Sequence, residues 1–141
     1  RDPGVRCLVA DCLGSSLYAH VVDGTLEAPG DSILEGIGIK RITANFRGCP
    51  ADGALRITDR DAVAMAHWLL HEEGLFVGGS AALNVLAAAR VARSLPMGSV
   101  VATIVCDGGG RYQSRLFNDA WRTAHGLGDL ATDLPAILGP G

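Results

Sequence analysis

Short continuous apolar runs alternate along the chain with longer apolar stripes that have helical spacing. The run richest in Val and Ile, Ser99–Cys106, predicts a strand over Val100–Val105 that is buried on both faces of a parallel sheet. A second run, Val5–Ala10, predicts another core strand. Shorter runs predict minor strands at Ile42–Phe46, Ala54–Ile57 and Leu75–Val77.

Apolar residues at helical spacing predict four helices with recognisable start and stop residues. The helix that ends at about Glu73 has Val63, Ala66 and Leu70 on its apolar face and Gly74 as its stop. The helices are expected at Leu17–Val22, from Thr58 to about Glu73, from Ala81 to about Leu95 after Ser80 as N-cap, and at about Gln113–Ala124. Residues after Gly126 predict a tail that packs on the body through Leu134, Ile137 and Leu138.

Strands and helices that alternate through short glycine-bearing connections are typical of a right-handed, parallel α/β sheet. Two core strands are fewer than such a sheet normally contains. The chain also begins at Arg1 and not at an initiator methionine. We therefore expect it to be a piece of a larger α/β unit.

Composition narrows the class of protein. The 141 residues suit one domain, and a formal net charge of −3 without a basic stripe argues against a nucleic-acid partner. No run reaches the roughly 18 apolar residues of a membrane span, and no signal-peptide core is present, so we expect no membrane contact and a cytoplasmic location. The four cysteines lack zinc-site spacing and are expected to be reduced thiols.

Two glycine-rich connections are candidates for ligand binding, because ligands of open α/β sheets sit where strands end and helices begin. Asp107–Arg111 follows the strand predicted at Val100–Val105 and contains three glycines. It would present a carboxylate and bare amides to a cofactor, or form only a tight connection. Gly78–Ser80 would hold an anion at a helix start, or form only an ordinary capped turn.

Other chemistry-bearing residues give weaker patterns. His67 and His71 have the spacing of a metal pair, but no HExxH motif or third ligand accompanies them, so a solvated helix face and no metal are expected. No GxSxG motif is present, which argues against hydrolase chemistry. Cys106 is expected to be a small buried strand residue, and Asn84 a helix residue bonded to backbone.

Three motifs occur in order along the chain. They are Glu35–Gly38 (EGIG) with Arg41–Thr43 (RIT), Glu72–Ser80 (EEGLFVGGS), and Thr103–Tyr112 (TIVCDGGGRY). Together they resemble the cysteine synthase and cystathionine β-synthase family, which are pyridoxal-phosphate enzymes of fold type II. The resemblance runs from about Val5 to Asn118. It implies that residues 1–126 are the C-terminal part of that three-layer, tryptophan synthase β-like parallel-sheet fold, followed by a tail over residues 127–141.

The resemblance implies pyridoxal 5′-phosphate as the cofactor of an intact parent enzyme. The implied cofactor-binding residues are Gly36, Ile37 and Gly38 along the active-site wall, and Asp107, Gly108 and Gly109 beside the pyridine ring. In the family, a hydroxyl side chain stands where this chain has Gly108. The ring nitrogen would therefore meet Asp107, a neighbouring side chain or water, or lose that contact.

The resemblance also implies a reaction. The parent, expected to be a homodimer, would eliminate the leaving group of an O-activated serine to give an aminoacrylate and then add sulfide to form cysteine. The alternatives are a cysteine desulfhydrase, which converts cysteine to sulfide, pyruvate and ammonia, and a non-catalytic remnant or binding module. Lys40 is the only lysine and does not match the Schiff-base motif, so that lysine is expected upstream and no catalytic residue is expected in this chain.

Overall fold

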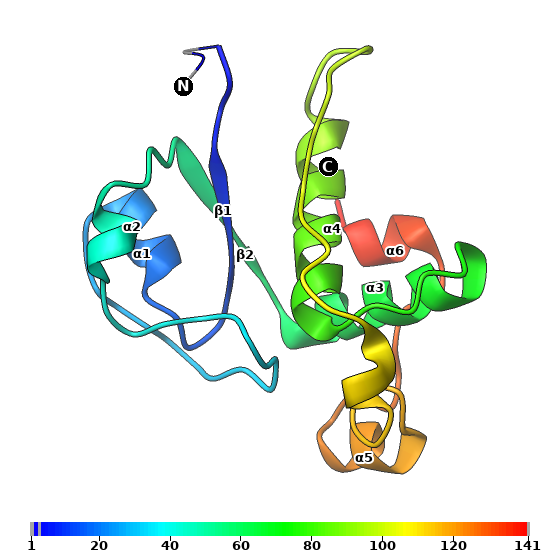
Figure 1. Ribbon diagram of the computed structural model, residues 1–141. Helices are drawn as coiled ribbons and strands as arrows, with labels where there is room; N and C mark the ends of the chain where they lie inside the picture. The colour runs from blue at the N-terminus through cyan, green and yellow to red at the C-terminus, as the bar shows by residue number, and fades with distance from the viewer. Residues whose placement is uncertain (1, 3, 141) are drawn as a thin grey trace. The chain divides into compact units, whose positions relative to one another are not determined.

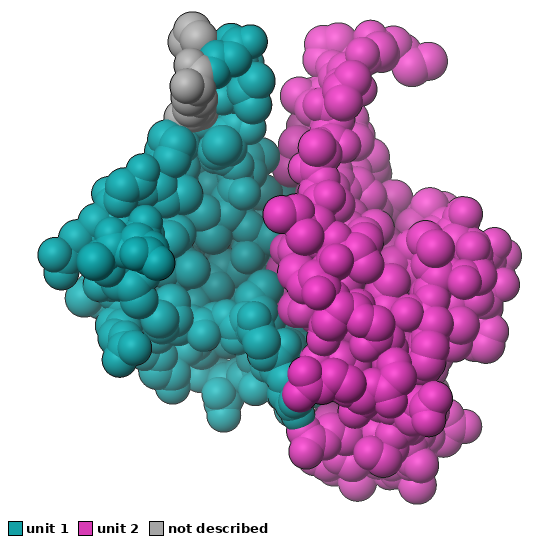
Figure 2. All heavy atoms as spheres, viewed as in Figure 1, with its two compact units in different colours: residues 1–58 teal, residues 59–141 magenta. Residues whose placement is uncertain are grey.

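The computed structural model describes residue 2 and residues 4–140 of the chain. These residues divide into two compact units, residues 1–58 and residues 59–141 (Figure 2). The first unit contains strands and short helices, and the second is helical (Figure 1). In the described residues, no helix is long and apolar enough to cross a membrane.

The first unit is built on a two-stranded parallel sheet. Strand β1 (Leu8–Cys12) pairs in parallel with β2 (Gly53–Ile57), in a register that sets Leu8 beside Gly53 and Cys12 beside Ile57. The α/β prediction is confirmed at this level, and β2 lies where a minor strand was predicted. Strand β1 begins and ends later than the predicted Val5–Ala10, because its pairing with β2 extends to Cys12.

Helix α1 (Leu17–Asp23) packs on both strands and confirms the first predicted helix. The helix ends at Gly24, which has a φ of 70° and donates its N–H to the Ala19 carbonyl. The buried Asp11 carboxylate accepts a hydrogen bond from the Tyr18 amide at 2.8 Å, so it satisfies a free N–H in the first turn. Strand β1 thereby fixes where α1 begins.

The strand predicted at Ile42–Phe46 is wrong. The structure has a short helix there, α2 (Ala44–Arg47), and Thr43 is its N-cap. The Thr43 side chain accepts a hydrogen bond from the Phe46 amide at 3.3 Å. A local cap of this kind outweighs the β-propensity of the short run.

The second unit is centred on two long helices, α3 (Asp59–Glu72) and α4 (Gly79–Arg93), which pack together and both contact α6 (Leu134–Leu138). Both long helices agree with the predicted ones, except that Gly78 and not Ser80 is the N-cap of α4. Helix α6 lies in the predicted tail. The core of the second unit includes five residues with at most 1% exposure, Val63, Met65, Leu83, Leu86 and Ile137.

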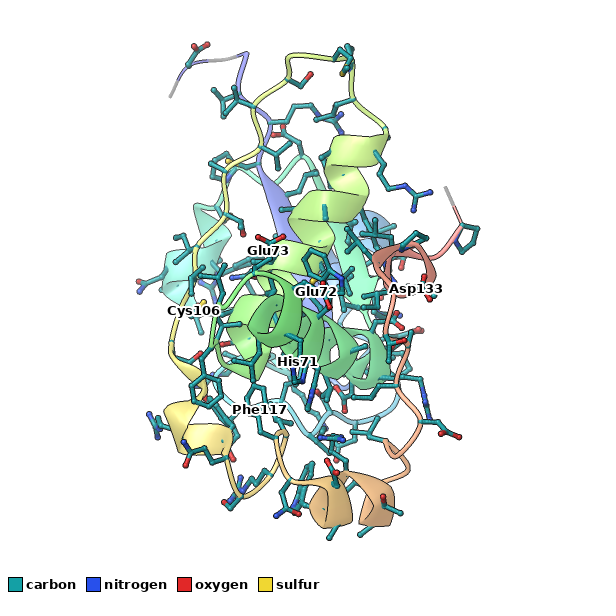
Figure 3. All side chains as sticks on the ribbon, turned by 90° about the vertical axis from the view of Figure 1, so that its right-hand side faces the viewer. His71, Glu72, Glu73, Cys106, Phe117 and Asp133 are labelled. Carbon is teal, nitrogen blue, oxygen red and sulfur yellow. The ribbon has the colours of Figure 1, made fainter. Side chains whose placement is uncertain are left out.

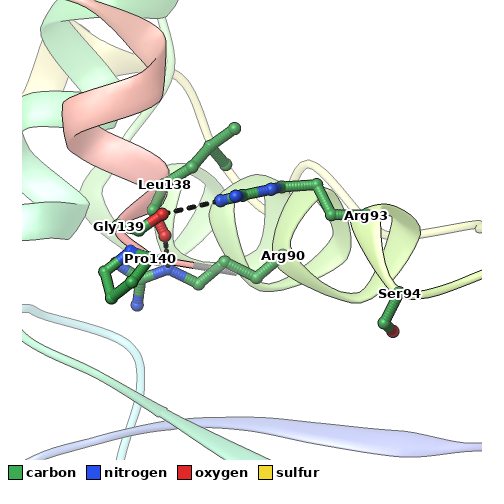
Figure 4. A pocket seen from close by; sticks show the side chains of 6 residues that line it. All are labelled: Arg90, Arg93, Ser94, Leu138, Gly139 and Pro140. Carbon is green, nitrogen blue, oxygen red and sulfur yellow. Dashed lines mark hydrogen bonds between the residues drawn. The ribbon is translucent and has the colours of Figure 1, made fainter.

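Two arginines of α4 hold the end of α6 (Figure 4). Arg90 donates to the carbonyls of Leu138 and Ile137 at 2.9 and 3.0 Å and forms a 2.8 Å ion pair with Asp61 of α3. Arg93 donates to the Gly139 carbonyl at 2.7 Å. These donors satisfy carbonyls that the end of a helix leaves free. A hollow of ≈ 470 Å³ lies beside them, but the contacts of its arginines are already structural.

The predicted core strand Val100–Val105 is not a strand in the structure. The segment is extended and exposed, and Cys106, predicted to be buried, is exposed as well (Figure 3). A strand exists only when a neighbouring strand pairs with its backbone, and the described residues supply none here. An isolated antiparallel bridge joins Gly108 to Val77, and Val77 belongs to the minor strand predicted at Leu75–Val77.

The helix predicted at about Gln113–Ala124 is right only in its second half. A 3₁₀ turn, η1 (Gly109–Tyr112), precedes it, and helix α5 (Asp119–Ala124) begins after Asn118. The Asn118 side chain accepts a hydrogen bond from the Trp121 amide at 2.9 Å. Asparagine in extended backbone is a strong N-cap, so it sets the start of the helix later than the apolar spacing predicts.

Candidate functional site

Two of the predicted cofactor-binding residues, Ile37 and Gly38, line a hollow of ≈ 210 Å³ in the first unit. Gly36 precedes them and is exposed. The hollow is formed by the turn after β1 and by the 31–40 loop. Its remaining lining residues are Cys12, Leu13, Gly14, Asp31, Ser32, Leu34, Ile39 and Lys40.

Serine side chains and amides fix the end of this loop. The buried Ser15 hydroxyl accepts a hydrogen bond from the Ile39 amide at 3.1 Å and lies 3.2 Å from the Ile39 carbonyl. The Ser16 amide donates to the same carbonyl at 2.8 Å. Gly38 has a φ of 88°, and a Cβ there would lie 2.7 Å from the Cys12 sulfur. Only glycine allows the loop to approach the turn this closely.

In the second unit, the Asp107 carboxylate links two elements. Its Oδ1 accepts a hydrogen bond from the Ser80 hydroxyl at 3.3 Å, and its Oδ2 accepts a short one from Tyr112. The bond to Asp107, together with burial, raises the pKa of the Tyr112 hydroxyl above its usual value of 10.0. Tyr112 therefore stays a donor to the carboxylate across the physiological pH range.

The backbone around Asp107 approaches the start of α4 closely. The Gly78 amide donates to the Asp107 carbonyl and the Gly109 amide to the Phe76 carbonyl, each at 3.0 Å. A Cβ on Gly78 would lie 2.2 Å from Asp107 Oδ1, and one on Gly109 would lie 2.4 Å from the Phe76 ring. Gly108 differs, because a Cβ there would meet only the Phe76 carbonyl at 3.8 Å.

The helix start at Gly78–Ser80, a candidate anion site, has a carboxylate of the same chain beside it. The helix start does attract a negative charge, and the carboxylate of Asp107 supplies it through the bond from Ser80. Asp107 in turn has both oxygens bonded within the protein. It is therefore the internal partner of α4, and Gly108 and Gly110 are the positions of this turn with open space.

The predicted solvated face holds for His71, which is exposed, but not for His67. His67 is half-buried, with its Nε2 at 2.8 Å from the Leu116 carbonyl and 3.0 Å from the Arg122 guanidinium. The rings of His71 and Phe117, both labelled in Figure 3, have centroids 6.1 and 5.0 Å from that of His67. In the part of the chain that the structure describes, no cluster of three metal-ligating side chains forms.

Sequence reasoning missed Tyr112 and its pairing with Asp107. The two residues are separated by the glycines, and no periodic pattern connects them. Asn84 is bonded to backbone as expected, since its amide donates to the Ile104 carbonyl at 3.1 Å. Ser80 is inside α4, where its hydroxyl reaches a residue that is distant in the sequence.

Comparison with known proteins places the chain among cofactor-dependent enzymes. Residues 1–107 match the family described as pyridoxal-phosphate dependent enzyme. The chain is 39% identical over 134 residues to a cysteine synthase of Dictyostelium discoideum, which covers 88% of this chain and 35% of that protein. It is 44% identical over 127 residues to cysteine synthase 1 of Emericella nidulans, with 87% and 34% covered. The chain thus spans about a third of the length of these relatives.

A solved structure is similar as well. It is that of an O-acetylserine dependent cystathionine β-synthase from Helicobacter pylori, with a TM-score of 0.71 and 33% sequence identity. The match covers 80% of this chain and 35% of that one. The likeness supports the family fold that the sequence motifs implied.

The contacts of His67 predict a pH-dependent stability. Burial first, and then the nearby Arg122 and His71, lower the pKa of His67 below its usual 6.5, against the opposing effects of the Leu116 carbonyl and Asp119. Below pH 6.5 the unfolded chain therefore takes up this proton before the folded chain does, and stability falls until the folded-state pKa is passed.

Urea unfolding of the wild type and of His67→Gln between pH 8 and pH 5 measures this effect. The Gln side chain keeps an acceptor for Arg122 but does not titrate, so the stability of the wild type should fall relative to the variant as the pH drops. His20→Gln, in helix α1 of the first unit and not among the groups that act on His67, is the control and should follow the wild type. Parallel profiles for wild type and His67→Gln would show that the pKa of His67 is not lowered by folding.

The three glycines around Asp107 predict unequal tolerance to a side chain. Gly78→Ala and Gly109→Ala force a Cβ into Asp107 or Phe76, and each should lower the free energy of unfolding by about 1–3 kcal/mol. Gly108→Ser has open space and an ordinary backbone, with φ of −87° and ψ of 159°, and should stay within about 0.5 kcal/mol of the wild type. Urea denaturation of the three variants tests this order, and a Gly108→Ser variant as unstable as Gly78→Ala would contradict it.

Proposed function

The chain belongs to the family of pyridoxal-phosphate dependent enzymes, and on that basis we propose that it is the C-terminal portion of a cysteine synthase-like enzyme. The whole enzyme would replace the β-substituent of an O-activated serine with sulfide to form cysteine. The observation that carries this proposal is the 39% identity to a cysteine synthase over 88% of the chain. The name of the structural relative, which is O-acetylserine dependent, favours an acylated serine as the activated substrate.

The residues present suit a flat aromatic cofactor at two places. A Cβ on Gly36 would meet no atom within 4 Å, and Gly108 is nearly as open. Backbone without side chains lets a planar ring approach closely. On the resemblance, we propose Gly36, Ile37 and Gly38 for the wall of a pyridoxal-phosphate site and Gly108 for the side of the pyridine ring, and the open backbone at Gly36 and Gly108 supports this. Bound there, the cofactor would serve as an electron sink for chemistry at the amino-acid substrate.

The resemblance places Asp107 and Gly109 beside the pyridine ring, but in this proposal both residues position the turn instead. Asp107 has Ser80 and Tyr112 as partners, which disfavours its use as the partner of the ring nitrogen. Gly109 lies against the Phe76 ring. Both residues would therefore position the turn, and Gly108 leaves the ring nitrogen without a hydroxyl from this segment.

The catalytic lysine is proposed to lie outside these 141 residues. Lys40, the only lysine, lines the same hollow as Ile37 and Gly38 but stands apart from the Schiff-base motif of the resemblance. Within the proposal, residues 1–126 belong to the three-layer catalytic fold and residues 127–141 form its tail. Homodimeric assembly of the whole enzyme is proposed on the resemblance, and a cytoplasmic location on the composition of the sequence.

An assay of the reaction products formed by the whole enzyme tests the proposed reaction. With pyridoxal phosphate, O-acetylserine and sulfide, we expect cysteine to accumulate, and with cysteine alone we expect no pyruvate. Pyruvate from cysteine without an added acceptor would identify a desulfhydrase and contradict the synthase assignment. Absence of both products would favour a non-catalytic binding module.

The place of the lysine has a separate test in the 141-residue chain itself. After incubation with pyridoxal phosphate and reduction with borohydride, mass spectrometry should find no pyridoxyl adduct on Lys40, and Lys40→Arg should give the same spectrum. A specific, stoichiometric adduct on Lys40 that is lost in Lys40→Arg would overturn the assignment of the lysine to another segment.

A further inference from the structure

His67 of α3 lies where α3 meets α5 and the stretch before it. Its Nε2 atom lies 2.8 Å from the Leu116 carbonyl and 3.0 Å from the Arg122 guanidinium, and both of those residues are buried. Its ring lies against that of Phe117, with centroids 5.0 Å apart. We call these four residues the His67 clasp, because they attach α5 and the stretch before it to α3.

The two polar contacts of His67 Nε2 require opposite roles of this atom. A carbonyl accepts a hydrogen bond and a guanidinium only donates one, so a single nitrogen cannot satisfy both. A neutral ring can carry its proton on Nδ1. Its Nε2 then accepts from Arg122, whose guanidinium also donates to the Leu116 carbonyl at 3.3 Å. A protonated ring has a hydrogen on each nitrogen, so it loses the Arg122 contact and faces a second positive charge at 3.0 Å.

The other charged groups around the ring do not cancel this repulsion. Asp119 favours a charged ring, but its side chain is 91% exposed and pairs with Arg122 at 2.7 Å. Burial first, and then Arg122 and His71, lower the pKa of His67 below its usual 6.5, against the opposing effects of the Leu116 carbonyl and Asp119. A ring released from the clasp regains its ordinary pKa. Release is therefore favoured as the pH falls below 6.5, until the closed form is protonated as well.

Bonds outside the clasp confine the release to residues 113–125. Before this stretch, the Tyr112 hydroxyl donates to the Asp107 carboxylate. After it, Arg60 of α3 donates to the Gly126 carbonyl at 2.7 Å. Neither bond involves His67, so both ends of the stretch stay attached when the clasp opens.

The Phe117 ring connects the clasp to the turn at residues 107–109. It packs edge-on against the Phe76 ring, with centroids 4.8 Å apart. Phe76 touches the turn twice, since its carbonyl accepts from the Gly109 amide at 3.0 Å and a Cβ on Gly109 would lie 2.4 Å from its ring. Movement of Phe117 away from Phe76 therefore removes the support of the ring that covers Gly109.

We propose that the His67 clasp is a pH-sensitive switch: when the ring gains a proton, residues 113–125 detach from α3 and the turn at residues 107–109 loosens. The change is local, because α3 and α4 keep their packing while the stretch between the two fixed ends opens. The switch goes beyond the proposed function, since it concerns a conformational change and requires neither cofactor nor reaction.

Hydrogen exchange of the 141-residue chain, followed amide by amide by NMR between pH 7.5 and pH 5, tests the switch. Protection factors correct for the pH dependence of the intrinsic exchange rate. We expect the protection of the Phe117 and Arg122 amides to fall at least about tenfold over this range, and that of the Gly109 amide at least about threefold. The Leu86 amide, at the centre of α4, should keep its protection.

Two histidine variants identify the group that titrates. His67→Gln keeps an acceptor for Arg122 but cannot gain a proton, so its Phe117 and Arg122 amides should stay protected at pH 5. His125→Gln is the matched control, because His125 lies within the stretch, with its Nδ1 2.7 Å from the Trp121 carbonyl, and is not among the groups that act on His67. This control should lose protection as the wild type does.

A titration of the His67 ring signals in the wild type needs no variant. Its midpoint should lie below pH 6.5 and coincide with the loss of protection at Phe117 and Arg122. A midpoint that does not coincide with this loss would show that another group causes it.

Four further results would each overturn the switch. These are constant protection of residues 113–125 down to pH 5 in the wild type, a loss that persists in His67→Gln, a loss that His125→Gln removes, and a Gly109 amide that stays protected while the stretch opens. An equal loss at Leu86 would assign the effect to unfolding of the whole unit and also contradict a local switch. None of the measurements uses cofactor or activity, so their outcome is independent of the proposed function.

Discussion

The second unit depends on the close approach of two backbone stretches, residues 76–80 and residues 107–109. Reciprocal hydrogen bonds join them, and Gly78 and Gly109 have no side chains that would keep them apart. The approach brings the Asp107 carboxylate to the start of α4, where free amides and the helix dipole favour a negative charge. Helix α4 can therefore begin in a buried environment and still have its polar groups satisfied.

The same contact determines what the turn offers to a ligand. Once Asp107 is bonded to Ser80 and Tyr112, its carboxylate is part of the scaffold. The open positions of the turn are Gly108 and Gly110, and Gly108 has neither a steric nor a conformational need for glycine. Rigid neighbours on both sides of an open backbone are a useful arrangement for holding a flat molecule, because the protein loses little freedom when the molecule binds.

Helices α1, α3 and α4 could be predicted from the sequence because their periodicity and stop residues are local. The failures at Ile42–Phe46 and at Gln113–Asn118 are local too, since Thr43 and Asn118 set helix starts that the apolar spacing does not reveal. Val100–Val105 fails for another reason. Its composition reflects a buried environment, and the residues described here do not supply that environment.

The candidate site was accessible from sequence only in part. Family motifs led to the glycines at 36, 38 and 108, but the partners of Asp107 depend on folding, since Ser80 lies 27 positions away and Tyr112 lies across a glycine turn. Glycine conformations can be inferred from a motif, whereas the choice of a carboxylate's partners is a property of the packed structure.

The arrangement around Arg90 limits how this chain can drift in evolution. One guanidinium serves Asp61 of α3 and two carbonyls at the end of α6 at the same time, although its side chain is 24% exposed. A lysine keeps the charge, but its single ammonium group cannot match the planar fork that reaches all three acceptors. Position 90 is therefore partly exposed, yet it does not accept lysine, which is the commonest charge-conserving exchange for arginine. A change there would have to be accompanied by changes in the tail.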